Sequence, residues 1–326
     1  MTAGPRLGID IGGTKTAVAL VADDTVQAFR SAPSGRGASG VVDVAVRLVR
    51  EVLQADGRGG VVPVGACMPG LVDPVSGLAR HAVNLEVESL DLAGELSARL
   101  GVPVAVENDV KAAALGAWRL RTARGAAEAA LAYLNLGTGL ASAVVRVGVV
   151  VRGIDGAAGE IGHLPVAGDT PCTCGQVGCL ETVASGSALA RLWPTAARRA
   201  RDPFVAAAAG DPLAGAAVDV LCTGVGLAVQ LLALASGAER VVIGGGLTAL
   251  GPPLLDGIRA DLARRARSSR MIDALGLPDR VELLPADVPV AALGAAWLGV
   301  REAPRLAAVA SADDGPGVDA PGERVG

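Results

Sequence analysis

The chain has 326 residues, which is long enough for two domains. Of these, 51% are apolar and only 2% aromatic, a composition typical of a globular protein. A formal net charge of −4 with scattered arginines argues against a nucleic-acid or anionic-membrane partner. The sequence enters a strand near residue 6 with no secretory leader, and no run of about eighteen uninterrupted apolar residues predicts a membrane span. We therefore expect a cytoplasmic protein, in which thiols stay reduced.

The first 120 or so residues alternate strand and helix patterns, as mixed α/β layers do. Apolar alternation predicts strands at 6–10 and 16–22, separated by a glycine turn, and further strands at 61–70 and 102–109. Apolar side chains three and four apart predict helices at 40–56, at 91–100 before Gly101, and at 110–120.

A second series of elements begins near residue 129. The pattern predicts strand, glycine turn and strand over 129–151, long Ala- and Leu-rich helices, a buried strand at 240–247, and a closing strand, turn and helix over 281–300. From Glu302 on, periodicity is lost and Gly, Pro, Ala and Asp dominate. This composition predicts a disordered tail at 302–326.

Two segments, "IDIGGTKTAVAL" and "LNLGTGLASAVV", share one plan. Each has an apolar strand, an Asp or Asn, a short Gly/Thr turn and a second strand, which suggests two related lobes facing each other across a cleft. Small residues let successive backbone N–H groups surround an anion, and Thr14 and Thr138 add hydroxyl donors. One such turn could be an ordinary hairpin, but the pair favours a polyphosphate held between the lobes.

Further groups suit a nucleotide. Asp10 precedes the first turn and could hold Mg²⁺ through water. Gly244, Gly245 and Gly246 follow a strand and suit contact with a base or ribose, although such turns also end strands for structural reasons. The sequence has no GxxxxGK[ST] stretch, so the chain is not a P-loop enzyme.

Three of the five cysteines and one of the two histidines gather in one glycine-rich loop. In a reducing compartment, clustered cysteines are metal ligands or catalytic groups more often than disulfides. One imidazole and three thiolates form a closed tetrahedral set for structural zinc. The candidate ligands are His163, Cys172, Cys174 and Cys179. The alternative, small buried apolar residues, suits Cys67 and Cys222 better, because each lies in an apolar run.

Polar side chains at two further places suit a sugar alcohol. Asp109 begins a helix after a strand, where it could be an N-cap or a general base that accepts a hydroxyl proton during phosphoryl transfer. Glu160, His163 and Glu181 offer groups that bind paired hydroxyls. Zinc on one ring nitrogen of His163 would leave the other free for a ligand and would fix the loop as a scaffold.

These segments together resemble the ROK family of sugar kinases and related repressors, in the actin-like ATPase superfamily. The resemblance covers about residues 7–300 and depends on "DIGGTK", "ENDVKAAALG", "LNLGTG", "GAAGEIGH", "CTCGQVGCLET", "VVIGGG" and "ALGAA". It implies an α/β, two-lobed actin-like ATPase (ribonuclease H-like) fold with ATP and sugar in the cleft, and a homodimer. We expect a small lobe at 1–118, joined by the helix 290–301, and a large lobe at 119–289 with the zinc loop 163–181.

The resemblance also implies a role for each matched residue. Asp109 matches the catalytic base. The matched sugar-binding positions are Asn108, Asp109, Glu160, His163, Glu181, Gly70 and Asn84. The matched zinc ligands are His163, Cys172, Cys174 and Cys179. The matched nucleotide positions are Asp10, Gly12, Gly13, Thr14, Lys15, Gly137, Thr138, Gly139, Gly244, Gly245 and Gly246.

Family repressors carry a helix-turn-helix region before the first glycine turn, and here only about six residues precede the first strand, so we expect a kinase. The expected reaction is ATP-dependent phosphorylation of a hexose at its primary hydroxyl, first of all glucose to glucose 6-phosphate. After Asn84 the chain reads "NLEVESL" where the family often has "NLPGW". This leaves open a kinase for N-acetylmannosamine or N-acetylglucosamine, and also a non-catalytic sugar sensor or polyphosphate as the donor.

Overall fold

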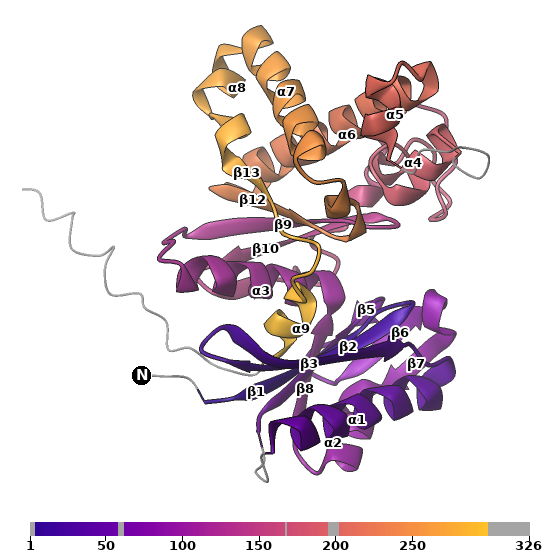
Figure 1. Cartoon of the computed structure of the whole chain (residues 1–326), viewed down its shortest axis with the longest axis vertical. Coiled ribbons are helices and arrows are strands. Elements are labelled where there is room, and N and C mark those ends of the chain that lie inside the picture. Colours follow the sequence, from indigo (N-terminus) through magenta and orange to yellow (C-terminus); the bar gives the residue numbers. More distant parts are fainter. Residues whose placement is uncertain (1–3, 58–61, 167, 195–201, 299–326) are drawn as a thin grey trace, which may run out of the picture.

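The computed structural model describes residues 4–57, 62–166, 168–194 and 202–298. Two five-stranded sheets lie in separate lobes, and helices α3 (Asp109–Ala123) and α9 (Val290–Ala295) lie between them (Figure 1). The predicted α/β class is therefore confirmed. The tail predicted at 302–326, and the last residues of the helix predicted at 290–301, lie outside the described residues.

The first sheet belongs to the lobe at the bottom of Figure 1 and has the strand order β3-β2-β1-β4-β8. Its strands are β3 (Thr25–Pro33), β2 (Lys15–Ala22), β1 (Arg6–Ile11), β4 (Val64–Met68) and β8 (Val104–Asn108). The first three pair antiparallel, whereas β4 and β8 join parallel to β1. Helices α1 (Gly37–Asp56) and α2 (Leu92–Leu100) bury their apolar sides in a core on one face of this sheet.

The second sheet repeats this plan, with the order β11-β10-β9-β12-β13. Its strands are β11 (Val149–Val151), β10 (Leu140–Arg146), β9 (Ala130–Leu136), β12 (Arg240–Gly244) and β13 (Val281–Leu283). Again three strands are antiparallel and two join in parallel. Asp10 of β1 pairs with Cys67 on the parallel strand β4. In the second sheet, Asn135 of β9 pairs with Gly244 on the parallel strand β12. The internal duplication inferred from the two glycine turns is therefore present in the strand order.

The sequence pattern predicted two strands around each glycine turn, one before and one after it. The structure adds a third strand to each of these pairs, β3 in the first half and β11 in the second. A small sheet of β5 (Leu71–Val72), β6 (Leu78–Ala82) and β7 (Val87–Asp91) was not predicted either. The turn before β11 is hidden because Val147, a β-branched residue, occupies it with φ of 47°. Apolar residues on both sides make the segment read as one continuous strand.

The turn at Val147 yields a stability prediction. Left-handed backbone is unfavourable for a β-branched residue and is tolerated by Asn, while Gly148 already fills the next position with φ of 77°. We expect Val147→Asn to raise the free energy of unfolding by about 1 kcal/mol in urea melts. The control is Val149→Asn, at an exposed β11 position, which removes strand propensity without relieving strain. A less stable Val147→Asn protein would contradict the assignment of strain.

Helices α4 (Gly186–Leu192), α5 (Pro203–Ala208), α6 (Pro212–Ser236), α7 (Pro252–Ser268) and α8 (Arg270–Ala274) belong to the second lobe (Figure 1). Among the described residues, α6 alone is long and apolar enough to cross a bilayer by length and composition. Half of its most apolar window is buried, and Leu221, Val225 and Val229 lie in the core of the second lobe. Burial of this kind is typical of a core helix. Cys222 in α6 is also buried, as predicted.

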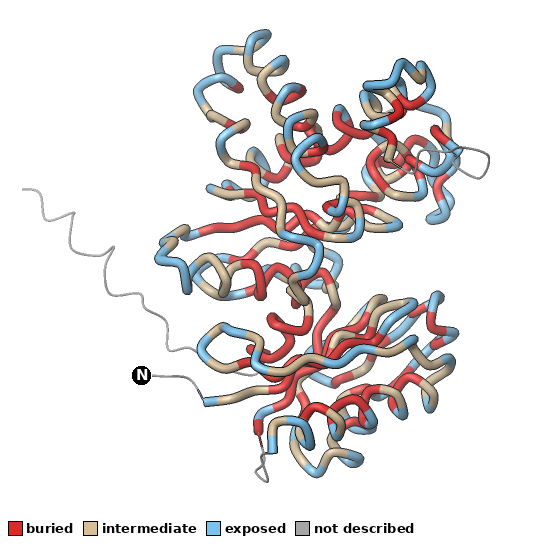
Figure 2. Tube along the Cα trace, viewed as in Figure 1, coloured by how far each residue is buried: buried red, intermediate tan, exposed pale blue. Residues whose placement is uncertain are grey.

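A third core fills the space between the sheets and is built from α3, α9 and the facing strands (Figure 2). The backbone of α9 is pressed against its neighbours: a Cβ on Gly8 would lie 1.7 Å from the carbonyl oxygen of Ala292, and one on Gly294 equally close to that of Ala112. Only glycine permits such approach. The predicted lobe boundary after residue 118 falls within α3, which contacts strands of both sheets, so the division into lobes stays a prediction.

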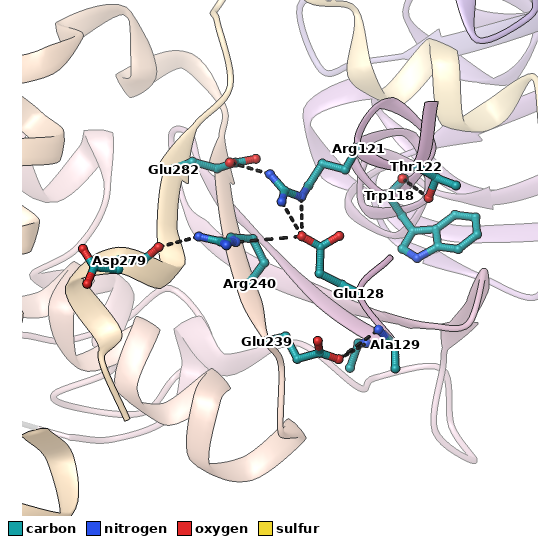
Figure 3. Close-up of polar contacts among 10 residues, drawn as sticks. Trp118, Arg121, Thr122, Glu128, Ala129, Glu239, Arg240, Asp279 and Glu282 are labelled. Atoms are coloured by element: carbon teal, nitrogen blue, oxygen red, sulfur yellow. Dashed lines mark hydrogen bonds and ion pairs between the residues drawn. The ribbon is translucent and has the colours of Figure 1, made fainter. Parts of the chain in front are cut away.

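The carboxyl-terminal turn of α3 is fixed to the second sheet by ion pairs (Figure 3). Arg121 donates from Nε to Glu128 at 3.0 Å and from Nη1 to Glu282 at 2.5 Å. Arg119, two residues earlier, bonds instead to Asp24 in the turn between β2 and β3. Helix α3 is thus tied to both lobes at one end, while its other end carries Asp109.

Candidate active site

Three parallel strands of the first sheet bring polar side chains to one face. The register pairs Asp10 of β1 with Cys67 of β4, and Cys67 with Glu107 of β8. Side chains at paired positions point to the same side of a sheet, so these three form a row facing α3 and α9. Cys67 is fully buried, as predicted, and its Sγ lies 3.8 Å from Asp10 Oδ1.

The strand-to-helix junction separates two roles that the sequence left open. Asn108, not Asp109, caps α3: its Oδ1 accepts from the backbone N–H groups of Val110 and Lys111. The Asn108 amide also donates to the carbonyl of Gly70 at 3.2 Å. Asp109 Oδ1 accepts from the N–H of Val110 at 2.9 Å, and the residue is partly exposed. The cap is therefore complete without Asp109, whose carboxylate is available for a ligand.

The carboxylates of Asp10 and Asp109 lie within electrostatic range of each other. Desolvation, followed by the charge of Asp109, raises the pKa of Asp10 to about 7. Desolvation is also the largest cause of the raised pKa of Asp109, and the charge of Glu160 raises it further. Burial and these two aspartates raise the pKa of Tyr133, on β9 of the other lobe. The site therefore concentrates negative charge from both lobes, which favours a cation or a hydrogen-bond donor there.

The first glycine turn is closed by its own backbone and by Ser34. Gly12 N–H donates to the carbonyl of Lys15 at 3.0 Å, and Ser34 Oγ donates to the carbonyl of Gly12 at 2.6 Å. Thr14 and Lys15 are exposed at the tip. Asn84 lies against this turn, since a Cβ on Gly13 would be 3.0 Å from the Asn84 Cβ. The structure therefore places a predicted sugar position beside a predicted phosphate turn.

The second glycine turn and the third glycine cluster are neighbours in the other lobe. Gly137 accepts from the N–H of Gly186, and Thr138 from that of Ser187, so the start of α4 supports the turn. A Cβ on Gly245 would lie 2.6 Å from the carbonyl oxygen of Leu136, at the end of β9. Gly246 is exposed with open space around it. Gly244 and Gly245 are thus needed for packing, whereas Gly246 leaves room for a ligand.

The predicted zinc ligands converge. The ligand atoms of His163, Cys172, Cys174 and Cys179 all lie within 4.8 Å of one another. Cys174 Sγ and Cys179 Sγ are 3.7 Å apart, and Cys172 Sγ is 3.7 Å from His163 Nδ1. Tetrahedral zinc with Zn–S bonds near 2.3 Å requires sulfur pairs about 3.8 Å apart. The donor types and spacing therefore fit zinc, with Nδ1 of His163 as the nitrogen ligand.

Glu181 connects this cluster to the second glycine turn. Its Oε1 lies 3.0 Å from Cys172 Sγ, and its Oε2 would lie 3.0 Å from a Cβ on Gly139. Glu160 is exposed at the start of the 3₁₀ turn Ile161–His163 and acts electrostatically on Asp109. Glu160 thus precedes His163 in the chain and acts on Asp109 through its charge. Glu181 follows His163 and contacts the second glycine turn.

Sequence reasoning missed three residues at this site. Ser34 closes the first turn, Tyr133 lies within electrostatic range of the two aspartates, and Glu107 forms an ion pair with Arg152. Each depends on a partner at least 22 residues away, as for Ser34 and Gly12. No local pattern signals such partners. Of the three, Glu107 had the clearest signal, because in the "VENDV" segment it directly precedes the predicted site residues Asn108 and Asp109.

A family model described as "ROK family" matches residues 6–301. The chain belongs to the ROK family. It is 32% identical over 319 residues to the glucokinase of Halalkalibacterium halodurans, covering 90% of this chain and 94% of that protein. It is 34% identical over 251 residues to the bifunctional enzyme NanE/NanK of Brucella melitensis, covering 74% of this chain and 45% of that protein.

Among solved structures, this ROK protein is similar to a ROK family glucokinase from Streptomyces griseus, in complex with glucose and AMPPNP. The TM-score is 0.71 at 28% identity, covering 90% of this chain and 98% of that one. The two-lobed actin-like fold expected from the sequence is thereby confirmed.

Proposed function

We propose that this ROK protein is an ATP-dependent sugar kinase that phosphorylates the primary hydroxyl of a hexose, with glucose as the first candidate. The observation that carries the proposal is the junction before α3, where Asn108 caps the helix and leaves the partly exposed Asp109 carboxylate available. The similarity to glucokinases over nearly the whole chain supports glucose.

Each group then has a task in phosphoryl transfer. Asp109 accepts the proton of the hexose hydroxyl as its oxygen attacks the terminal phosphorus, and burial, which raises its pKa, makes it a stronger base than an exposed aspartate. Glu160, His163 and Glu181 bind the other hydroxyls and hold the sugar in line. The turns at Gly12–Thr14 and Gly137–Gly139 bind phosphate oxygens through backbone N–H groups other than those of Gly12 and Gly137, which donate within the turns. The loop at Gly246 contacts adenosine.

Two ions fit the residues present. Mg²⁺ would be held by Asp10 through water, and it supplies charge neutralisation for the nucleotide phosphates. Zinc would be held by His163, Cys172, Cys174 and Cys179 and supplies no reaction step, because four protein ligands leave no open position. We also propose a cytoplasmic location and a homodimer.

The pKa of Asp10 gives a pH prediction for Mg²⁺ binding. Because burial raises this pKa to about 7, the proton must leave before the carboxylate can attract Mg²⁺. We expect the dissociation constant of Mg²⁺ with the nucleotide bound to rise about tenfold for each pH unit below 7 and to level off above it. Calorimetry in buffers of different ionisation enthalpy measures the released proton. An affinity independent of pH, or unchanged in Asp10→Asn, would exclude Asp10 as the Mg²⁺ group.

A coupled assay that follows ATP consumption over a panel of hexoses tests the proposed function. We expect the highest kcat/KM with glucose. A clear preference for N-acetylmannosamine or N-acetylglucosamine would favour the second candidate, which the similarity to NanE/NanK and the residues after Asn84 support. Binding of a hexose without consumption of ATP or polyphosphate would indicate a sugar sensor instead.

A further inference from the structure

One ion pair, of a buried carboxylate with a partly exposed arginine, joins the two lobes beside the candidate base. Glu107, at the end of β8, has a side chain only 1% exposed, and its Oε2 accepts from Arg152 Nε at 2.6 Å. Arg152 directly follows β11 in the other lobe. A buried carboxylate needs such a partner, because loss of one member leaves an uncompensated charge.

The other oxygen of Glu107 acts on the segment that carries Asp109. Glu107 Oε1 accepts from the backbone N–H of Asn108 at 3.0 Å, and Asn108 caps α3. The Glu107 carboxylate therefore holds the backbone one residue before Asp109. The same side chain lies in the row with Cys67 and Asp10, so its charge also reaches the cation side of the site.

Arg152 in turn begins the loop that leads to Glu160. Its carbonyl accepts from the N–H of Ala158 at 3.2 Å. The next turn of this loop is fixed to β10, because the N–H and hydroxyl of Ser142 both donate to the carbonyl of Gly159. One ion pair therefore connects the backbone before Asp109 to the loop before Glu160, across the boundary between the lobes.

We propose that Arg152 is a positioning residue that acts through Glu107: it sets the distance between Asp109 and the Glu160 loop, and it balances the Glu107 charge beside the base. The inference rests on the proposed function, since it assigns Arg152 a role in placing the proton acceptor. Neither residue belongs to the predicted sugar, nucleotide or zinc positions.

Because Arg152 and Glu107 carry opposite charges, the proposal predicts that their removal changes the ionisation of Asp109 in opposite directions. The charged or titratable groups around Asp109 come from both lobes. Glu160 and Lys111 act on Asp109, and Asp109 acts in turn on Asp10 and Tyr133. Glu107, paired with Arg152, stands two residues before Asp109. Removal of Arg152 leaves the Glu107 charge unpaired, which favours the protonated form of Asp109. Removal of the Glu107 charge leaves Arg152 unpaired, which favours the ionised form. Removal of both restores the balance.

The test is the pH profile of kcat at saturating hexose, ATP and Mg²⁺ for Arg152→Gln, Glu107→Gln and the double variant. We expect the acid limb to move up by about one pH unit in Arg152→Gln, down in Glu107→Gln, and back to the wild-type position in the double variant. At neutral pH kcat falls about tenfold in Arg152→Gln, and Arg152→Lys recovers part of it. Glu107→Gln keeps an acceptor for Asn108 N–H, so it folds even if Arg152→Gln does not.

Arg146→Gln is the matched control. Arg146 lies on β10, in the same hairpin, and bonds to the carbonyl of Ser236 away from Asp109, so its acid limb stays in place. Equal losses of kcat with no movement of the acid limb in any variant would overturn the proposal. If instead Asp109→Asn keeps native turnover, the proposed base itself is wrong, and the two failures are thereby distinguished.

Discussion

Asp109→Asn is expected to lower kcat by roughly 10²–10⁴-fold while leaving the dissociation constant of glucose within about threefold of the native value. The amide cannot accept the hydroxyl proton, but it keeps the size of the side chain and an oxygen that can accept from Val110 N–H, as Asp109 Oδ1 does at 2.9 Å. Helix α3 stays capped because Asn108 supplies the cap. Steady-state kinetics and calorimetric titration with glucose measure the two quantities separately.

Asp91→Asn is the matched control, because Asp91 also stands at the start of a helix. Its carboxylate accepts from the N–H of Gly94 at 2.9 Å and caps α2, away from the site residues. We expect this variant to keep its kcat and to change only in stability, by less than about 1 kcal/mol. Near-native turnover in Asp109→Asn would refute the role of Asp109 as the base.

Loss of zinc is expected to affect stability and sugar binding together. Cys179 is fully buried, its Sγ lies 3.7 Å from that of Cys174, and Glu181 follows two residues later. We expect Cys179→Ser to lose the zinc, to melt at a lower temperature, and to raise KM for the hexose by roughly 10–100-fold. The reason is that Glu181 belongs to the same loop, two residues after Cys179, and lies over Gly139 of the second glycine turn.

Cys222→Ser is the control for this change, because Cys222 is a buried thiol in α6 that belongs to no metal cluster among the described residues. We expect it to keep one zinc per chain and the native KM, even where it costs some stability. Elemental analysis, thermal melts and hexose kinetics give the three readings. A native protein purified without zinc, or a Cys179→Ser protein with native zinc and KM, would contradict the structural metal.

The helices expected at 40–56, 91–100 and 110–120 are present, with ends that differ by up to three residues. Their apolar spacing is a local property, and a single side of each helix contacts a core, so the pattern could be read directly. The strands β3 and β11 could not be read in this way. The turn before β11 contains Val147, which normally avoids left-handed backbone, and the sheet imposes this conformation on it. The turn before β3 is formed by Asp23 and Asp24, and no apolar spacing marks it.

One part of the candidate site could likewise be predicted from the sequence, and another part could not. The candidate zinc ligands lie within a loop of 17 residues, from His163 to Cys179, and their chemical types alone indicate a metal. Asp109 was left with two interpretations, an N-cap or a base. Only the backbone geometry assigned the cap to Asn108, because the sequence cannot tell which of two adjacent side chains turns back onto the helix.

The sequence by itself determined the α/β class, the duplicated glycine turns and the candidate zinc ligands, since each depends on residue types at short spacing. Only the tertiary structure decided which distant groups surround Asp109. Glu107 and Arg152 are 45 residues apart in the chain and meet because β8 and β11 end on facing sides of the two lobes. Such a contact depends on strand register and on the packing of α3 and α9 between the sheets, and no short stretch of sequence encodes either.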